Sequence, residues 1–129
     1  MIVRSLQSIA DSDRDVSGKT WRSRRLLLKK DGMGFSMHDT MLYAGTVTRM
    51  WYKNHLEAVY CIEGKAEIEE LDNGTVHQIE PGVIYALNDH DRHELRVFED
   101  VRFVCVFNPP CTGRETHDAD GAYPLLEDD

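Results

Sequence analysis

The most constraining feature of this sequence is a series of short strand-like segments, separated by turn-forming residues at close intervals over most of the chain. Such a series is typical of an all-β sandwich or barrel. The expected strands span residues 20–30, 40–48, 57–62, 66–71, 76–79, 83–87, 93–98 and 101–107. Only residues 7–14 favour a short helix.

Turn-forming residues mark the ends of these strands. The segment 71–75 contains an Asn-Gly pair and predicts a hairpin, because such pairs adopt the positive φ angles of a tight turn. Pro-Gly at 81–82 and Glu-Gly-Lys at 63–65 predict two further turns. Asn-Pro-Pro at 108–110 is expected to end the last strand, since proline cannot continue a β-ladder.

Composition narrows the class of protein. A chain of 129 residues without repeats predicts a single domain over residues 1–129, with about 111–129 forming a polar C-terminal tail or flap. The net charge of −8 argues against a nucleic-acid partner. No apolar stretch is long enough to span a membrane, and the N-terminal segment acquires acidic residues too early for a secretion signal, so we expect a cytoplasmic protein. Three cysteines without a CxxC pair argue against a disulfide framework or a cysteine zinc site.

Two spacings point to a known kind of barrel. Glu57 precedes Gly64 by seven positions, and Gly82 precedes His93 by eleven. Both spacings resemble the two-part signature of the cupin superfamily, whose members are small jelly-roll-like β-barrels that often hold a metal inside. The resemblance predicts an all-β, cupin-type barrel with at most one or two short helices and a metal site around Glu57 and His93.

The departures from that signature concern the remaining metal ligands. Cupins normally supply two histidines shortly before the glutamate, but residues 50–53 are Met-Trp-Tyr-Lys. At least one ligand must therefore come from elsewhere. Tyr85, His55 and His90 are the candidates; a Glu/Tyr/His set with hard oxygen ligands would suit iron. Taken singly, Tyr85 is more often a core residue, His55 a residue at the rim of the site, and His90 a turn residue.

A closer resemblance covers essentially the whole chain. The block 50–64, Met-Trp-Tyr-Lys-Asn-His-Leu-Glu-Ala-Val-Tyr-Cys-Ile-Glu-Gly, resembles ectoine synthase, as do segments 20–25, 32–36, 81–87 and 103–110. The resemblance implies a hydro-lyase that closes N4-acetyl-L-2,4-diaminobutyrate into the compatible solute ectoine with loss of water. It also implies an iron cofactor, expected as Fe2+, held by Glu57, Tyr85 and His93.

The same resemblance assigns further residues to the site. Its substrate-binding residues are expected to be Trp21, Arg25, His38, Thr40, Tyr52, Cys105 and Phe107. Its catalytic groups are expected to be Tyr52, Glu115 and His117. A guanidinium such as that of Arg25 suits a substrate carboxylate, and an indole such as that of Trp21 suits a cation. His38 stands where some relatives carry asparagine.

The sequence also leaves two alternative functions open and suggests an oligomeric state. A metal-free cupin isomerase or epimerase acting on a small polar substrate is the enzymatic alternative. A module that binds a small zwitterion without converting it is the non-enzymatic one. Small cupins often cover a sheet face by pairing, so we also expect a homodimer.

Overall fold

The computed structural model describes residues 1–112, and nearly all of its regular structure is β-strand. One 8-stranded antiparallel sheet has the order β1-β2-β3-β8-β5-β6, with β4 paired to β8 and β7 paired to β5. The strands are β1 Asp15–Ser17, β2 Trp21–Leu27, β3 Ser36–Leu42, β4 Val47–Met50, β5 Leu56–Glu70, β6 Val76–Ile79, β7 Ile84–Leu87 and β8 His93–Asn108. The helical elements are α1 Leu6–Ile9 and the 3-10 turn η1 Lys29–Asp31. The prediction of an all-β protein with at most two short helices is confirmed.

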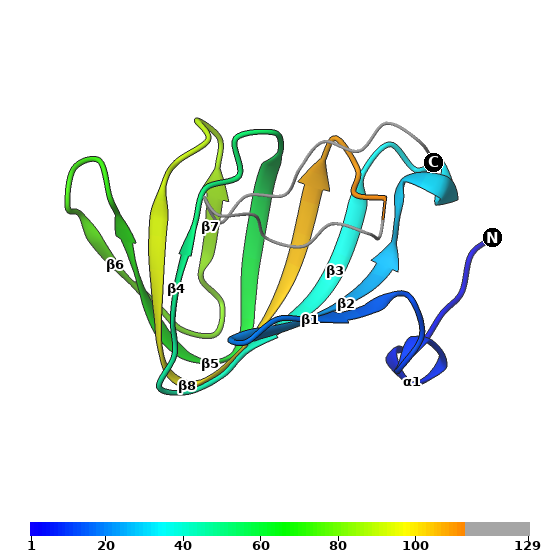
Figure 1. Cartoon of the computed structure of the whole chain (residues 1–129), viewed down its shortest axis with the longest axis horizontal. Coiled ribbons are helices and arrows are strands. Elements are labelled where there is room, and N and C mark those ends of the chain that lie inside the picture. Colours follow the sequence, from blue (N-terminus) through cyan, green and yellow to red (C-terminus); the bar gives the residue numbers. More distant parts are fainter. Residues whose placement is uncertain (113–129) are drawn as a thin grey trace.

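The two long strands, β5 and β8, bend the sheet into its barrel-like shape. They pair with each other along most of their length, and both turn at the bottom of the view in Figure 1. The register shifts between Cys61 and Ala66, as expected where extra residues bend a strand. Gly64 has a φ of +90° at this bend, and a Cβ there would collide with the carbonyl of Asp100. A side chain at this position would therefore prevent the close approach of β5 and β8.

The bend corrects part of the expected strand division. The predicted strands 57–62 and 66–71 are one strand, β5, and the predicted turn at 63–65 is a bulge inside it. Likewise 93–98 and 101–107 belong to β8. A strand pattern that changes face around a glycine looks like two strands in sequence, because the bulge that bends one strand shifts its alternation.

Other predicted boundaries moved for local reasons. The predicted strand 40–48 is interrupted by a turn at 43–46, in which the Thr46 amide donates to the Tyr43 carbonyl at 3.2 Å. The predicted helix 7–14 is shorter: Ser5 caps α1, and Asp11 with a φ of 59° lies beyond its end. β1 was not predicted. The turn at 71–75 is longer than a two-residue hairpin, and only Gly74 of its Asn-Gly pair has positive φ.

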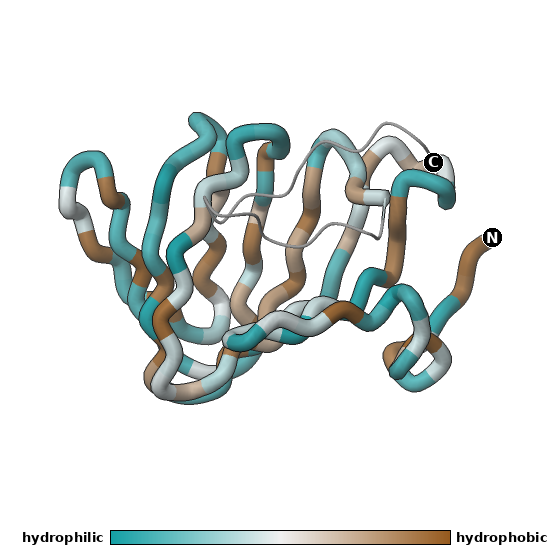
Figure 2. The backbone as a smooth tube through the Cα atoms, in the orientation of Figure 1, coloured by the Kyte–Doolittle hydropathy of each residue, from teal (hydrophilic) through white to brown (hydrophobic). Residues whose placement is uncertain are grey.

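The core lies on the concave side of the sheet. Buried and less buried residues alternate along β2 and along both halves of β8, as the pleat requires. Figure 2 shows the consequence: hydrophobic stretches recur within the strands, while hydrophilic residues gather in the loops along the upper edge. Several inward-facing residues are nevertheless polar, and they mark the candidate site. They include Arg25, His38, His55, Glu57 and His93.

Candidate active site

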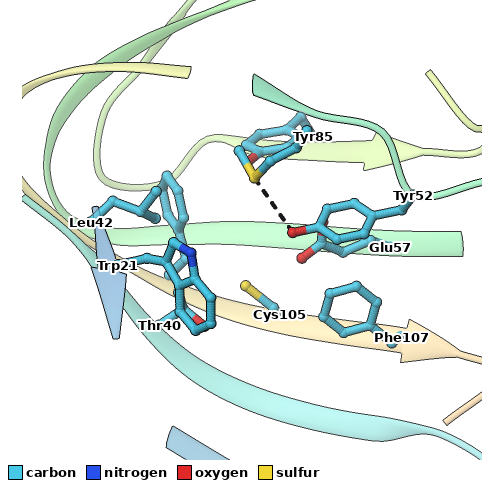
Figure 3. A pocket seen from close by; sticks show the side chains of 10 residues that line it. Trp21, Thr40, Leu42, Tyr52, Glu57, Tyr85, Cys105 and Phe107 are labelled. Carbon is cyan, nitrogen blue, oxygen red and sulfur yellow. Dashed lines mark hydrogen bonds between the residues drawn. The ribbon is translucent and has the colours of Figure 1, made fainter. Parts of the chain in front are cut away.

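Side chains from six strands and one loop surround a cavity inside the barrel (Figure 3). Seven of its lining residues were predicted for the site: Trp21, Thr40, Tyr52, Glu57, Tyr85, Cys105 and Phe107. Three were not: Leu42, Met50 and Phe103. Each of these three carried a signal in the sequence. Leu42 and Phe103 lie two positions from Thr40 and Cys105 on the same strand faces, and Met50 stands in the region of the absent cupin histidines.

Glu57 is the carboxylate of this cavity, and it is buried without a cationic partner that affects its titration. Burial raises the pKa of Glu57 to about 8, and a hydrogen bond with the thiol of Cys105 opposes that rise only in part. Cys105 is in turn hydrogen-bonded to Thr40, and burial together with the charge of Glu57 holds its pKa well above the usual range. The three side chains thus form a short polar chain across β3, β8 and β5.

Tyr85 lies on another part of the cavity wall, with His93 packed against it. Their ring centroids are 6.2 Å apart, and Tyr85 also packs edge-on against Phe103 at 6.0 Å. Burial, followed by the charge of Glu57, raises the pKa of Tyr85 well above its usual range. Burial lowers the pKa of His93. Near neutral pH, these shifts all favour the neutral form of the phenol, the imidazole and the Glu57 carboxyl.

The orientation of His93 leaves one ring nitrogen for another partner. Its Nδ1 lies 3.0 Å from the carbonyl oxygen of Asp91, which can only accept, so Nδ1 carries the proton. Nε2 then presents a lone pair, and it is buried without a hydrogen-bond partner among residues 1–112. A backbone carbonyl on the other ring nitrogen is the usual support of a metal-binding histidine.

These features fit a metal ion. A buried Glu, a partly buried Tyr and an imidazole lone pair form a hard oxygen and nitrogen donor set that suits iron, and a cation would lower the pKa of both oxygen ligands. Among residues 1–112 no three side chains of the His, Cys, Asp and Glu types cluster to hold a metal. Within the described residues, Tyr85 is the further oxygen donor beside Glu57 and His93.

The two other candidate ligands lie differently. His90 is exposed in the turn before β8, where its Nδ1 contacts the carbonyl of Tyr52 at 2.9 Å. His55 is buried, but its ring packs edge-on against Phe107 at 5.8 Å. Neither shares the ring contact that joins Tyr85 to His93. The structure therefore favours Tyr85 over both histidines on position alone.

Trp21 and Tyr52 form walls of the cavity. The Trp21 indole lies over Gly18, where an added Cβ would come within 2.6 Å of the ring, so a glycine leaves it room. The Tyr52 hydroxyl donates to the sulfur of Met50 at 3.4 Å, the dashed line of Figure 3. Its ring packs against Phe107 at 5.4 Å. An aromatic wall with one phenolic hydroxyl is suited to hold a small, partly polar molecule.

Arg25 and His38 do not line this cavity, although both are fully buried beside it. They face each other across β2 and β3, and His38 packs against Phe107 at 4.9 Å. Burial, then the charges of Arg25 and His55, lowers the pKa of His38 well below its usual value. The expected catalytic residues Glu115 and His117 lie outside the described residues.

Comparison with known proteins identifies this arrangement. The family model for ectoine synthase matches residues 1–127. The chain belongs to the ectoine synthase family. It is 64% identical over 130 residues to the L-ectoine synthase of Desulfatibacillum aliphaticivorans, which covers 99% of this chain and 100% of that protein. It is 57% identical to the L-ectoine synthase of Halalkalibacterium halodurans, over 100% of both chains.

Solved structures agree with the family assignment. The crystal structure of ectoine synthase from P. lautus superposes with a TM-score of 0.88 at 58% identity, covering 98% of this chain and 91% of that one. KdgF from Halomonas sp. shares the fold alone, with a TM-score of 0.62 at 18% identity over 73% of this chain and 84% of that one.

Two predictions are thereby confirmed. The chain is an enzyme of the hydro-lyase class, in a family of ectoine synthases, and its fold is that of the cupins. Within residues 1–112, no helix is both long and apolar enough to cross a membrane.

Proposed function

We propose that this protein converts N4-acetyl-L-2,4-diaminobutyrate into ectoine with loss of water, and that it uses iron held by Glu57, Tyr85 and His93. The observation that carries the proposal is the convergence of these side chains beside one cavity: Glu57 and Tyr85 line it, and the His93 ring lies 6.2 Å from that of Tyr85. Full-length likeness to L-ectoine synthases supports the substrate and product.

The proposed reaction closes a ring within one molecule. The free α-amine adds to the carbonyl carbon of the acetamide, the carbonyl oxygen is protonated and leaves as water, and a carbon–nitrogen double bond remains. An amide is a weak electrophile, and bound iron would supply the Lewis acidity that polarises its oxygen. The walls of the cavity hold the substrate folded. The entropy lost in bringing the amine and the carbonyl together is therefore lost on binding and not in the reaction step.

The surrounding residues have separate proposed roles. Arg25 binds the substrate carboxylate, and Trp21 packs against the cationic end of the substrate or against the amidinium product. Tyr52 donates its hydroxyl hydrogen to the substrate in place of Met50, whose sulfur is a weak acceptor. Glu115 and His117 remain the proposed proton-transfer groups.

Direct product formation tests the proposal. Purified protein is incubated with Fe2+ and N4-acetyl-L-2,4-diaminobutyrate, and ectoine is quantified by chromatography, with a metal-chelated sample in parallel. We expect many ectoine molecules per protein with iron and a large loss on chelation. Absence of ectoine under both aerobic and anaerobic conditions would overturn the function, and full activity after exhaustive chelation would overturn the role of iron.

A homodimer in the cytoplasm, acting in the response to osmotic stress, completes the proposal. Apolar side chains on the outer face of β5 and β7 support pairing with a second copy: Leu56, Tyr60 and Ile84 are 39%, 45% and 63% exposed. Burying such a face is favourable in proportion to its apolar area. Light scattering of the purified chain should give the mass of a dimer, and Ile84→Lys should shift it toward the monomer. A monomeric wild-type chain would contradict the assembly.

A further inference from the structure

We propose that Ser23 is a positioning residue that fixes His38 as the neutral tautomer with its proton on Nε2, and that this N–H donates to a carboxylate oxygen of the bound substrate. The inference deepens the proposed function and rests on it for the identity of the ligand. It assigns a role to Ser23, which the predicted site did not include, and a specific protonation state to His38.

The strand register brings the three participating residues together. Ser23 and Arg25 are two positions apart on β2 and therefore face the same side of the sheet. His38 on β3 is the register partner of Arg25, and its other neighbour in register is Cys105 on β8. Exposure of Ser23, Arg25 and His38 is 1%, 0% and 0%, so water does not compete for their polar atoms.

The direction of the hydrogen bonds follows from the chemistry of each group. The Nε of Arg25 can only donate, and it lies 3.3 Å from the Oγ of Ser23. The Ser23 hydroxyl therefore accepts from Arg25 and has its own hydrogen to donate. Nδ1 of His38, at 3.2 Å, is the acceptor within reach. Since Nδ1 accepts, the proton of the neutral ring is on Nε2.

The surroundings keep the ring neutral. Burial disfavours the charged imidazolium form of His38, and the positive charge of Arg25 and that of His55 when protonated disfavour it further. Ser23 and Phe107, which also contact the ring, carry no charge. The hydrogen bond that Ser23 accepts from the Arg25 guanidinium also polarises its hydroxyl group, and this strengthens the hydrogen bond that the hydroxyl donates to Nδ1 of His38.

The Nε2–H of His38 is buried, and no group in the described part of the chain accepts a hydrogen bond from it. Leaving such a donor unsatisfied is unfavourable, so a bound ligand that provides an acceptor is stabilised there. In the proposed substrate the amine is a donor once protonated, and the amide oxygen is the reacting atom beside Glu57. The carboxylate is the acceptor that remains, and it suits a site beside Arg25.

The tautomer is measured directly in the full-length protein. Protein labelled with 15N-histidine and loaded with diamagnetic Zn2+ gives two-bond 15N–1H correlations that distinguish a protonated from an unprotonated ring nitrogen. We expect protonated Nε2 and unprotonated Nδ1 for His38, and loss of this single tautomer in Ser23→Ala. Protonated Nδ1 in the wild type, or an unchanged pattern in Ser23→Ala, would overturn the relay.

Binding is tested by a double-mutant cycle on ectoine formation. His38→Ala should raise KM about 10-fold and Ser23→Ala about 3- to 10-fold, with small effects on kcat, since each removes ground-state binding. The double variant should be no worse than His38→Ala alone, because Ser23 acts through His38. Ser17→Ala, at the exposed end of β1, is the control.

Additive effects in the cycle would overturn the positioning role of Ser23, and an unchanged KM in His38→Ala would overturn the contact with substrate. Should His38→Ala fail to fold, His38→Gln replaces it and retains a donor near the position of Nε2, so its KM should stay near wild type. A wild-type protein that forms no ectoine would refute the proposed function and the substrate contact, while the NMR measurement would still decide the tautomer.

Discussion

Two carboxylates of this protein are almost equally hidden from water but have opposite surroundings. Glu57 is 7% exposed and Asp31 has a side chain that is 8% exposed. For Asp31, burial favours protonation, but hydrogen bonds from Arg4, Arg14 and the Leu28 amide outweigh it and hold its pKa well below the usual range. For Glu57, burial prevails and raises the pKa to about 8.

This difference indicates that Asp31 stabilises the fold, whereas Glu57 serves the candidate site. Asp31 joins the N-terminal segment to the turn after β2, with Arg4 at 2.9 Å and Arg14 at 3.0 Å. Its charge is compensated within the fold, so it stabilises the folded chain. Glu57 has only the Cys105 thiol as a favourable contribution to its charged form. A carboxylate that is buried with so little compensation for its charge is unfavourable for folding and is typical of functional sites.

Removing Glu57 should have the largest effect. If the Glu57 carboxylate is a ligand of the metal, Glu57→Ala should lose the bound iron. The variant should then lower kcat/KM by about 1,000-fold or more, because the iron that would act as the Lewis acid is lost with its ligand. Metal analysis and ectoine formation measure both, and His93→Ala should behave alike. Glu80→Ala, at an exposed position, is the control. Either variant with full iron content would refute the ligand assignment.

Removing Arg25 should separate substrate binding from metal binding. Arg25→Ala should keep its iron and raise KM by about 10- to 100-fold, because a charge-assisted contact with the substrate carboxylate is lost. The control is Arg22→Ala, which removes another arginine of β2, one that pairs with Asp15 of β1. Unchanged KM and kcat in Arg25→Ala would remove this residue from the site.

The stability of the metal-free protein should depend on the protonation of Glu57. A folded-state pKa raised from 4.5 to about 8 means that the fold favours the protonated carboxyl. The free energy of unfolding should therefore be highest below about pH 4.5 and fall as the pH rises from there to about 8, on the order of 5 kcal/mol in all. Glu57→Gln should abolish this decrease. Denaturant titrations at acidic, neutral and alkaline pH measure it, and an equal slope in both proteins would contradict the assignment.

Asp31 should show the opposite pH dependence and the smallest effect. Asp31→Asn should lower the free energy of unfolding by about 1–2 kcal/mol at neutral pH, because two arginines lose a shared partner. Since the folded-state pKa of Asp31 is depressed, the difference from wild type should shrink as the pH falls below 3.8. Ectoine formation per folded molecule should not change. A loss of activity at unchanged stability would show that this contact belongs to the site.

Much of the fold was predictable from local sequence. The short strands 76–79 and 83–87 were found within one residue, because their turns at 71–75 and 81–82 contain Gly or Pro. The division of β5 and β8 was wrong for a physical reason. A bulge around Gly64 and its contact with Asp100 depend on a partner strand more than thirty residues away.

The sequence by itself determined the class of fold, the family and the residue types of the site, because spacing and motif are carried by the order of side chains. Only the tertiary structure decided which of them meet. It joins Tyr85 to His93 and leaves His55 against Phe107, and it places Ser23 between Arg25 and His38. These contacts arise from strand register and from the bend of the sheet, which are set by pairing between distant segments.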